Sequence, residues 1–212
     1  MLALFNSINS AVCGALGINT YLQGVIIMVC INTIAVLGMS VLTGFTRLFS
    51  FGNAGFMSIG AYTAAILTVK FNVNFLLAII LGALFAGFIA FLLGSITLRL
   101  KGDYFLITCL GFGECVRVLF NYTKNITGGS AGYPGIPAYS NALFSLVCVV
   151  LAFFAAWRFI HSKYGRNLTS IRENEMAAEA VGINAFRVKR MSFVFSAIYA
   201  GWAGALYGGY LM

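Results

Sequence analysis

Two charged side chains, Glu114 and Arg117, lie within the apolar stretch 104–122. A spacing of three residues places a carboxylate and a guanidinium on one face of a helix, where they can form an ion pair. If the stretch crosses a membrane, an unpaired charge costs about 2.5–3.5 kcal/mol, so both groups need a partner or water. They are either a structural ion pair that locks helix packing or part of the polar wall of a solute pathway. General acid–base catalysis is not indicated, because no second carboxylate lies near Glu114 in the sequence.

The remaining reactive side chains give little support for metal or redox chemistry. The single histidine, His161, has no companion at metal-ligand spacing. The five cysteines form no C-x-x-C pair, and apolar surroundings of all but the first are typical of small buried side chains. These cysteines are Cys13, Cys30, Cys109, Cys115 and Cys148. We therefore expect no metal site, no cofactor and no enzymatic activity.

The longest polar stretch, 161–190, contains the signature of a short helix. Ser170 followed by Glu173 fits a capping box at a helix start, and Gly182 fits the glycine that follows a helix end. Together they predict a helix over 171–181, about 16 Å long. Its apolar residues share one face, namely Met176, Ala177, Ala180 and Val181. Such a helix is either a rigid knob that transmits movement from a soluble partner or an ordinary loop helix.

The composition requires that much of the chain lies in a membrane. The 212 residues are 61% hydrophobic and 8% charged, whereas soluble domains carry about 25% charged residues. One core of this size cannot bury so much apolar surface. An ordinary cytosolic enzyme, a secreted disulfide-linked module and a disordered regulator are thereby excluded. The net charge of +8 fits the basic cytoplasmic loops of a membrane protein, and we expect no binding to nucleic acid.

Apolar segments of about 20 residues predict an all-α fold, a polytopic transmembrane helical bundle of about six spans. The expected spans are 23–43, 50–69, 74–98, 104–122, 142–160 and a sixth from 191 to the end of the chain. Residues 1–22 are expected to form an external or interfacial tail. With 161–190 in the cytoplasm, the lysines and arginines of the connections fall inside except Lys70 and Lys124. This distribution favours an external N-terminus.

Small residues recur at helical spacing in several expected spans. The third span carries Gly82, Ala86, Ala90 and Gly94, and the sixth carries Ala200, Gly204 and Gly208. Such rows let helices approach closely and predict a packing seam within the chain, with a subunit interface as the alternative. The glycine-rich start of 50–69 indicates close backbone approach or a broken helix that lines a polar cavity. The candidate pathway or packing glycines are Gly52, Gly55, Gly60, Gly111 and Gly113.

Four stretches taken together resemble the permease subunits of the branched-chain amino acid ABC transporters, of the LivM/LivH type. They are SFGNAGFMSIGAYT at 50–63, LRLKGDYF at 98–105, LGFGECVR at 110–117 and GRNLTSIRENEMAAEAVGIN at 165–184. The loop TGGSAG at 127–132 is also similar to the family's. The resemblance runs from about residue 20 to the end and makes 23–212 the permease domain. Each motif alone would be weak, whereas the combination is specific to the family.

The resemblance implies an importer of branched-chain amino acids in the cytoplasmic (inner) membrane. Its implied partners are a second, similar permease, two cytoplasmic ATP-binding subunits, a periplasmic amino-acid-binding protein and membrane lipid. The implied coupling segment is 165–184, with the family's pattern on Glu175, Ala177, Ala178 and Gly182. The two alanines would let the helix seat in a groove on the ATPase, and Glu175 would present a charge at the rim. The permease itself would hold no nucleotide and perform no covalent chemistry.

Three alternatives stay open at this point. A permease for another small polar solute, such as urea or a short amide, fits the same residues. A secondary transporter or channel that works alone would need no ATPase, and a non-transporting membrane scaffold is the third reading. The family usually continues through further spans beyond the coupling segment, so we expect the chain to be shortened at its C-terminus.

Overall fold

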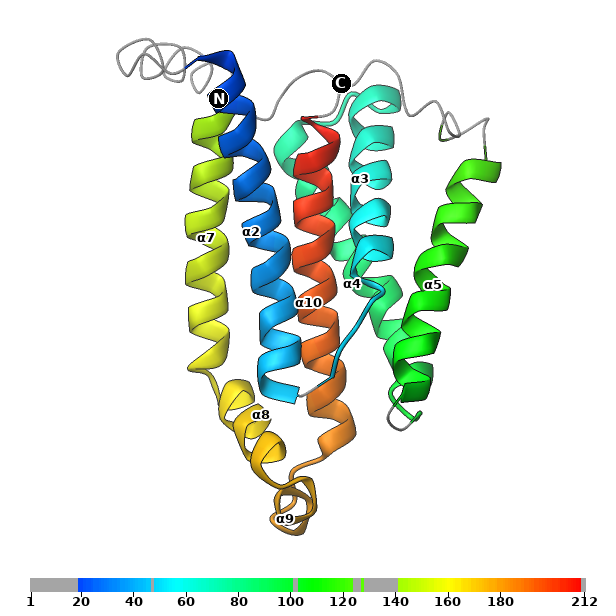
Figure 1. The fold of residues 1–212 in the computed structure, drawn as a ribbon, viewed down its shortest axis with the longest axis vertical. Coiled ribbons are helices and arrows are strands. Elements are labelled where there is room, and N and C mark those ends of the chain that lie inside the picture. Colours follow the sequence, from blue (N-terminus) through cyan, green and yellow to red (C-terminus); the bar gives the residue numbers. More distant parts are fainter. Residues whose placement is uncertain (1–18, 47, 101–102, 124–126, 128–140, 211–212) are drawn as a thin grey trace.

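Long helices run up and down side by side through the protein (Figure 1). The computed structural model describes residues 19–46, 48–100, 103–123, 127 and 141–210. The long helices are α2 (Thr20–Thr46), α3 (Asn53–Lys70), α4 (Phe75–Thr97), α5 (Asp103–Tyr122), α7 (Ala142–Ile160) and α10 (Ala185–Gly208). Two short helices, α8 (Lys163–Glu173) and α9 (Glu175–Ala180), connect α7 to α10 at one end of the bundle. The described residues contain no strand, which confirms the predicted all-α class.

Four helices, α2, α4, α5 and α7, are long and apolar enough to cross a membrane. The apolar part of α3, Asn53–Val69, is shorter. Helix α10 has 24 residues and many buried side chains, and it begins with several cations. A helical membrane bundle is therefore confirmed, and successive long helices alternate in direction (Figure 1). The number of six spans stays a prediction that this alternation supports.

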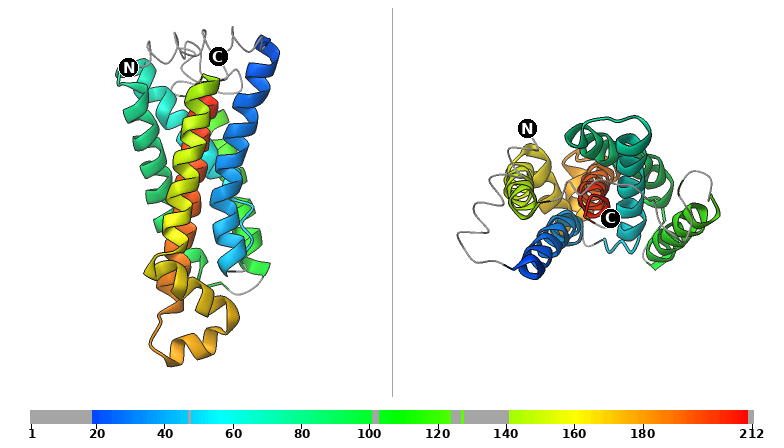
Figure 2. Two further views of the ribbon diagram at one scale, coloured as in Figure 1. Left: turned by 90° about the vertical axis from the view of Figure 1, so that its left-hand side faces the viewer. Right: turned by 90° about the horizontal axis from the view of Figure 1, so that it is seen from above.

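Helix α10 forms the centre of the bundle (Figure 2). It packs most extensively on α3 and α4, and then on α2. Helix α7 packs on α2, and α5 stands at the opposite edge against α3. The hydroxyl of Tyr199 on α10 donates a 2.8 Å hydrogen bond to the carbonyl of Ala152 on α7. Helix α10 thus contacts α2, α3, α4 and α7, whereas α5 lies at the periphery.

Small residues make the close packing around α10 possible. A Cβ atom at Gly201 would lie 2.6 Å from the Cβ of Ala86 on α4. A Cβ atom at Gly60 on α3 would overlap the backbone of Gly201, and one at Gly204 would overlap the carbonyl of Met57. This arrangement confirms the predicted packing seam within the chain. Helix α3 is continuous from Asn53, so its glycines serve close backbone approach rather than a break in the helix.

The predicted boundaries agree with the structure to different degrees. The expected span 142–160 coincides with α7. Helix α10 begins at Ala185, six residues before the expected start of the last span at 191, and its first turns carry the cations Arg187, Lys189 and Arg190. The side chain of Asn184 accepts a 3.0 Å hydrogen bond from the backbone N–H of Arg187 and so caps the helix further upstream. Residues 1–18 of the expected tail and 128–132 of the TGGSAG loop lie outside the described residues.

Basic residues gather at the end of the bundle that carries α8 and α9. Lys70, the last residue of α3, lies at the opposite end. The described lysines and arginines at the α8–α9 end are Arg99, Arg158, Lys163, Arg166, Arg172, Arg187, Lys189 and Arg190. A basic end of this kind is typical of the cytoplasmic side of a membrane protein, and the orientation of this chain stays a prediction.

Candidate functional site

The segment between α7 and α10 is a bent pair of helices and not the single helix expected over 171–181. Helix α8 ends at Glu173, and Asn174 adopts an extended conformation with φ −154° and ψ 108°. Its side-chain oxygen accepts a 3.1 Å hydrogen bond from the N–H of Ala177 and caps α9. Ser170 lies inside α8, where its hydroxyl donates to the carbonyl of Arg166 at 3.1 Å. The predicted capping box is therefore wrong, because Asn174 provides the cap four residues later.

The predicted glycine at the end of this segment is confirmed. Gly182 has φ +89°, a conformation that side chains with a Cβ rarely adopt. Its N–H donates to the carbonyl of Glu179 at 2.9 Å, and the N–H of Ile183 donates to Ala178 at 3.0 Å. These two bonds form a Schellman motif, which ends α9 and directs the chain into α10.

Gly165 fixes the turn at the other end of the segment. It is buried, and a Cβ atom there would overlap the carbonyl of Ile160 at the end of α7. Only a residue without a side chain lets α8 fold back so closely on α7. Sequence reasoning did not single out Gly165 or Asn174 as a turn, although glycine and asparagine at polar junctions are the usual signals for one.

The two alanines of the implied coupling segment occupy different environments. Ala178 is 5% exposed and packs in a small apolar cluster with residues of α8 and α10. Ala177 is exposed. The most exposed apolar side chains of the segment are Met176, which is 84% exposed, and Val181, which is 82% exposed. The exposed apolar surface at α9 therefore comprises Met176, Ala177, Ala180 and Val181, whereas Ala178 joins α9 to the body of the protein. The methyl group of Ala178 is covered by this chain, and the contact of the segment with a partner stays a prediction.

Glu175 forms an ion pair across the turn at Gly182, between α9 and α10. Its carboxylate accepts a hydrogen bond from the Nζ of Lys189 on α10 at 2.5 Å. The carboxylate is half exposed, so the pair contributes at most about 1 kcal/mol. Its geometric effect is to link the start of α9 to the first turns of α10. The charge expected at the rim of the segment is therefore present but paired within the chain.

The candidate glycines at α3 and α5 differ in whether they lie against a neighbouring helix. Gly60 is buried in the seam against Gly201. A Cβ atom at Gly55 would lie 3.2 Å from the Cα of Gly113, and one at Gly52 would lie 3.0 Å from the carbonyl of Cys109. Gly52 and Gly55 thus let α5 approach α3. Gly111 is exposed, and a Cβ atom there would meet nothing within 4 Å.

Glu114 and Arg117 form the predicted ion pair. One guanidinium nitrogen of Arg117 lies 3.2 Å from a carboxylate oxygen of Glu114. The side chain of Glu114 is 60% exposed and that of Arg117 is 72% exposed. The packed face of α5 carries apolar residues such as Phe105, Cys109 and Val116. The ion pair therefore points away from the bundle and does not lock the packing of helices within this chain.

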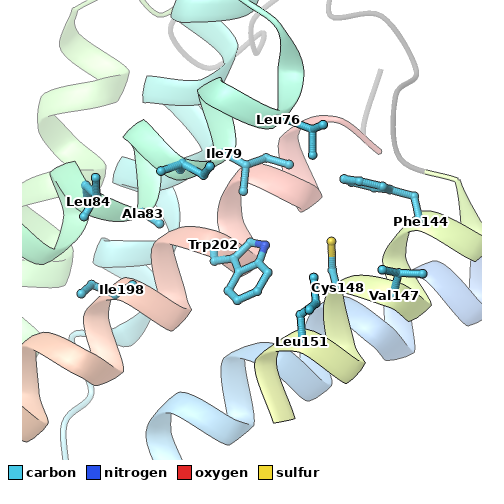
Figure 3. A pocket seen from close by; sticks show the side chains of 11 residues that line it. Leu76, Ile79, Ala83, Leu84, Phe144, Val147, Cys148, Leu151, Ile198 and Trp202 are labelled. Carbon is cyan, nitrogen blue, oxygen red and sulfur yellow. The ribbon is translucent and has the colours of Figure 1, made fainter. Parts of the chain in front are cut away.

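The protein also has an apolar groove on its surface. A groove of about 530 Å³ lies between α4 and α7 with α10 as its floor (Figure 3). Ile79, Cys148 and the indole of Trp202 are among the side chains that line it. Its lining residues are all uncharged and almost entirely apolar, which suits hydrocarbon better than a polar solute. Among the described residues there is also no cluster of histidine, cysteine and acidic side chains that could hold a metal ion.

Comparison with known proteins gives one family. The family described as branched-chain amino acid transport system / permease component matches residues 21–211. The high-affinity branched-chain amino acid transport system permease protein LivM of Salmonella typhimurium is 34% identical over 85% of this chain and 50% of its own length. LivM of Escherichia coli K12 is 34% identical over 81% of this chain and 48% of its own length. The chain thus spans about half the length of these curated relatives.

A more distant relative has a different named solute. The nucleoside ABC transporter permease protein NupC of Lactococcus lactis subsp. cremoris is 24% identical over 74% of this chain and 57% of its own length. No solved structure matches the chain significantly. The family match over residues 21–211, the 34% identity to the LivM proteins and the apolar helices lead to one conclusion. This chain is a multi-pass membrane protein that belongs to the branched-chain amino acid transport system permease family.

Proposed function

We propose that this protein is a permease subunit of an ABC importer that carries branched-chain amino acids across the cytoplasmic (inner) membrane. Its partners would be a second homologous permease, two cytoplasmic ATP-binding subunits and a periplasmic amino-acid-binding protein. The family match and the LivM relatives support this proposal. The protein would hold no cofactor and perform no covalent step, since its part in transport is mechanical.

The observation that carries the proposal is the α8–α9 segment at the basic end of the bundle. Its outer surface carries Met176, Ala177, Ala180 and Val181, an apolar patch about one and a half helical turns long. An exposed patch of this kind at the membrane surface suits a groove on a soluble partner. The ATP-binding subunits are the partner that the family implies. We therefore assign the coupling role to Glu175, Ala177 and Gly182, with Ala178 as an internal contact.

Movement of α9 would pass directly into α10. The Glu175–Lys189 pair, the buried Ala178 and the Schellman turn at Gly182 join α9 to the start of α10. Helix α10 in turn packs closely on α2, α3 and α4, so its tilt would move the middle of the bundle. Closely packed interfaces change by discrete shifts of whole helices, which is what alternating access requires.

The solute pathway would follow the outward face of α5, between this chain and the second permease. Gly111, Glu114 and Arg117 lie on the exposed side of that helix, and Gly113 lies beside them against α3. Gly52, Gly55 and Gly60 would serve as packing residues that hold α3 and α5 in place.

A permease for nucleosides or another small polar solute, such as urea or a short amide, is the second candidate. The 24% identity to NupC favours it, but the identity to LivM is higher over a larger share of this chain. A transporter or channel that works alone would leave the exposed patch on α9 without a role. Uptake of radiolabelled leucine, adenosine and urea by the assembled complex separates the first two candidates.

Co-purification tests the ABC assignment most simply. The tagged chain is expected to retain the ATP-binding subunits after mild detergent extraction. Glu175→Lys and Gly182→Asp are expected to uncouple ATP-driven uptake while membrane insertion stays normal. Glu179→Gln is the matched control, because Glu179 is exposed on α9 and belongs to no ion pair within the described residues. Unimpaired ATP-driven uptake by both coupling variants would refute the coupling role.

A further inference from the structure

The exposed ion pair on α5 lies where hydrocarbon cannot cover it. Glu114 is near the middle of α5, and only 17% of this span is buried by the rest of the chain. Figure 2 shows α5 at the edge of the bundle, seen from above. A charge that faces lipid at this depth costs about 2.5–3.5 kcal/mol on the lenient insertion scale. The face must therefore meet water, protein or a polar ligand.

Both members of the pair retain unused hydrogen-bonding capacity. Within the described part of the chain, the guanidinium of Arg117 donates to Glu114 alone, at 3.2 Å. A guanidinium has five N–H donors, and a carboxylate has about four acceptor positions. A ligand that carries an acceptor for Arg117 and a donor for Glu114 can therefore bind without unpairing either group.

The surroundings of the pair favour an aliphatic ligand. Glu114 lines a shallow hollow of about 480 Å³ together with Cys115, Val118 and Leu119, and Arg117 lies outside the lining of this hollow. One helical turn before Glu114, Gly111 leaves the same side of the helix open, since a Cβ atom there would meet nothing within 4 Å. Apolar side chains thus lie beside the carboxylate of Glu114, and the approach along the helix past Gly111 is unobstructed.

We propose that Glu114 and Arg117 form a binding site on the transport pathway for the ammonium and carboxylate groups of a zwitterionic, aliphatic α-amino acid. This inference rests on the proposed transport function. The ammonium group would donate to Glu114, and the carboxylate would accept two parallel hydrogen bonds from Arg117. The site has no net charge, so it matches a zwitterion. A cationic or anionic solute would match only one of the two protein charges, and an uncharged solute would match neither Glu114 nor Arg117.

Cys115 provides a reporter within the hollow. It is exposed, whereas Cys109 and Cys148 are buried. The experiment uses the complex of this chain with its partner subunits in proteoliposomes, with the other four cysteines replaced by alanine. The rate at which a hydrophilic methanethiosulfonate reagent modifies Cys115 is measured without ligand and with leucine, 3-methylbutylamine or 4-methylpentanoate. The last two compounds each lack one of the two charges of leucine.

We expect Cys115 to react in the absence of ligand and leucine to slow the reaction about tenfold, while the two singly charged analogues leave it unchanged. Glu114→Gln is expected to abolish this protection and to lower leucine uptake about tenfold. The double variant Glu114→Gln/Arg117→Gln has no charge to bury, so it should assemble normally and still lack protection.

Two outcomes would overturn the site while leaving the proposed function intact. In the first, Cys115 stays unreactive while the wild-type complex carries leucine, because a second permease covers this face. In the second, leucine is carried equally well by wild type and by both variants. If the wild-type complex carries no leucine at all, the proposed function fails and the site fails with it.

Discussion

The substitution Gly201→Ala tests the close packing that makes α10 the centre of the bundle. The added methyl group would lie 2.6 Å from the Cβ of Ala86, whereas carbon atoms in contact are about 3.5–4.0 Å apart. Helices α4 and α10 must therefore separate by about 1 Å. A gap of that size removes a quarter to a half of the attraction between the facing atoms, and overpacking typically costs about 1–3 kcal/mol. The higher helix propensity of alanine returns up to about 1 kcal/mol.

The net loss is expected to be about 1–2 kcal/mol, which corresponds to a decrease in Tm of about 4 °C for a chain of this length. The assay is the fraction of protein that stays monodisperse in detergent after heating. Gly44→Ala is the matched control, because Gly44 is also helical and a Cβ atom there meets nothing within 4 Å. Its Tm is expected to stay the same or to rise. A Gly201→Ala protein as stable as the Gly44→Ala protein would show that the seam is not closely packed.

Three further predictions follow from individual contacts. Asn174→Ala removes the cap of α9 and costs about 1 kcal/mol of local stability; hydrogen exchange at the Ala177 amide should become faster, and unchanged protection would contradict this role. The exchange Glu175→Lys/Lys189→Glu restores an ion pair with reversed charges, so uptake should recover relative to Glu175→Lys alone; an exchanged protein as impaired as the single variant would argue against a link between α9 and α10. Tyr199→Phe removes the 2.8 Å hydrogen bond from α10 to the carbonyl of Ala152, which keeps its partner within helix α7, and is expected to destabilise the protein by about 1 kcal/mol; thermal unfolding in detergent measures the change, with Tyr21→Phe, on an exposed side chain, as the control.

The sequence predicted the membrane helices well because bilayer thickness fixes their length and apolar composition. Residues 142–160 illustrate this, since polar segments bound them on both sides and α7 has the same limits. The packing seam was also predictable, because rows of glycine and alanine have few other uses in a spanning helix. The pairing of Glu114 with Arg117 followed from their spacing alone.

The bend at Asn174 could not be chosen from local patterns. Ser170 and Asn174 both fit a helix start, and burial decides between them. With the bend at Asn174, Leu168 and Ile171 of α8 reach the same cluster as Ala178 of α9. A straight helix over 171–181 would begin in the last turn of α8. Only the arrangement of α8, α9 and α10 in space selects the later start.

Contacts across the turn at Gly182, between α9 and α10, were beyond the reach of sequence patterns. Glu175 and Lys189 are separated by fourteen positions and lie on different helices. Their pairing depends on the angle that the turn at Gly182 sets between α9 and α10. The burial of Ala178 and the exposure of Ala177 depend on the same angle. A shared motif therefore could not show which of the two alanines is open to a partner.

Cross-linking from α9 tests the central claim most directly. In a chain whose native cysteines are replaced, Met176→Cys is expected to cross-link to an ATP-binding subunit in the intact complex. It should resist a membrane-impermeant thiol reagent applied to intact cells. Lys70→Cys, at the opposite end of the bundle, is the control and should show the reverse on both counts. Labelling of Met176→Cys from outside intact cells, with no cross-link to an ATP-binding subunit, would contradict the account.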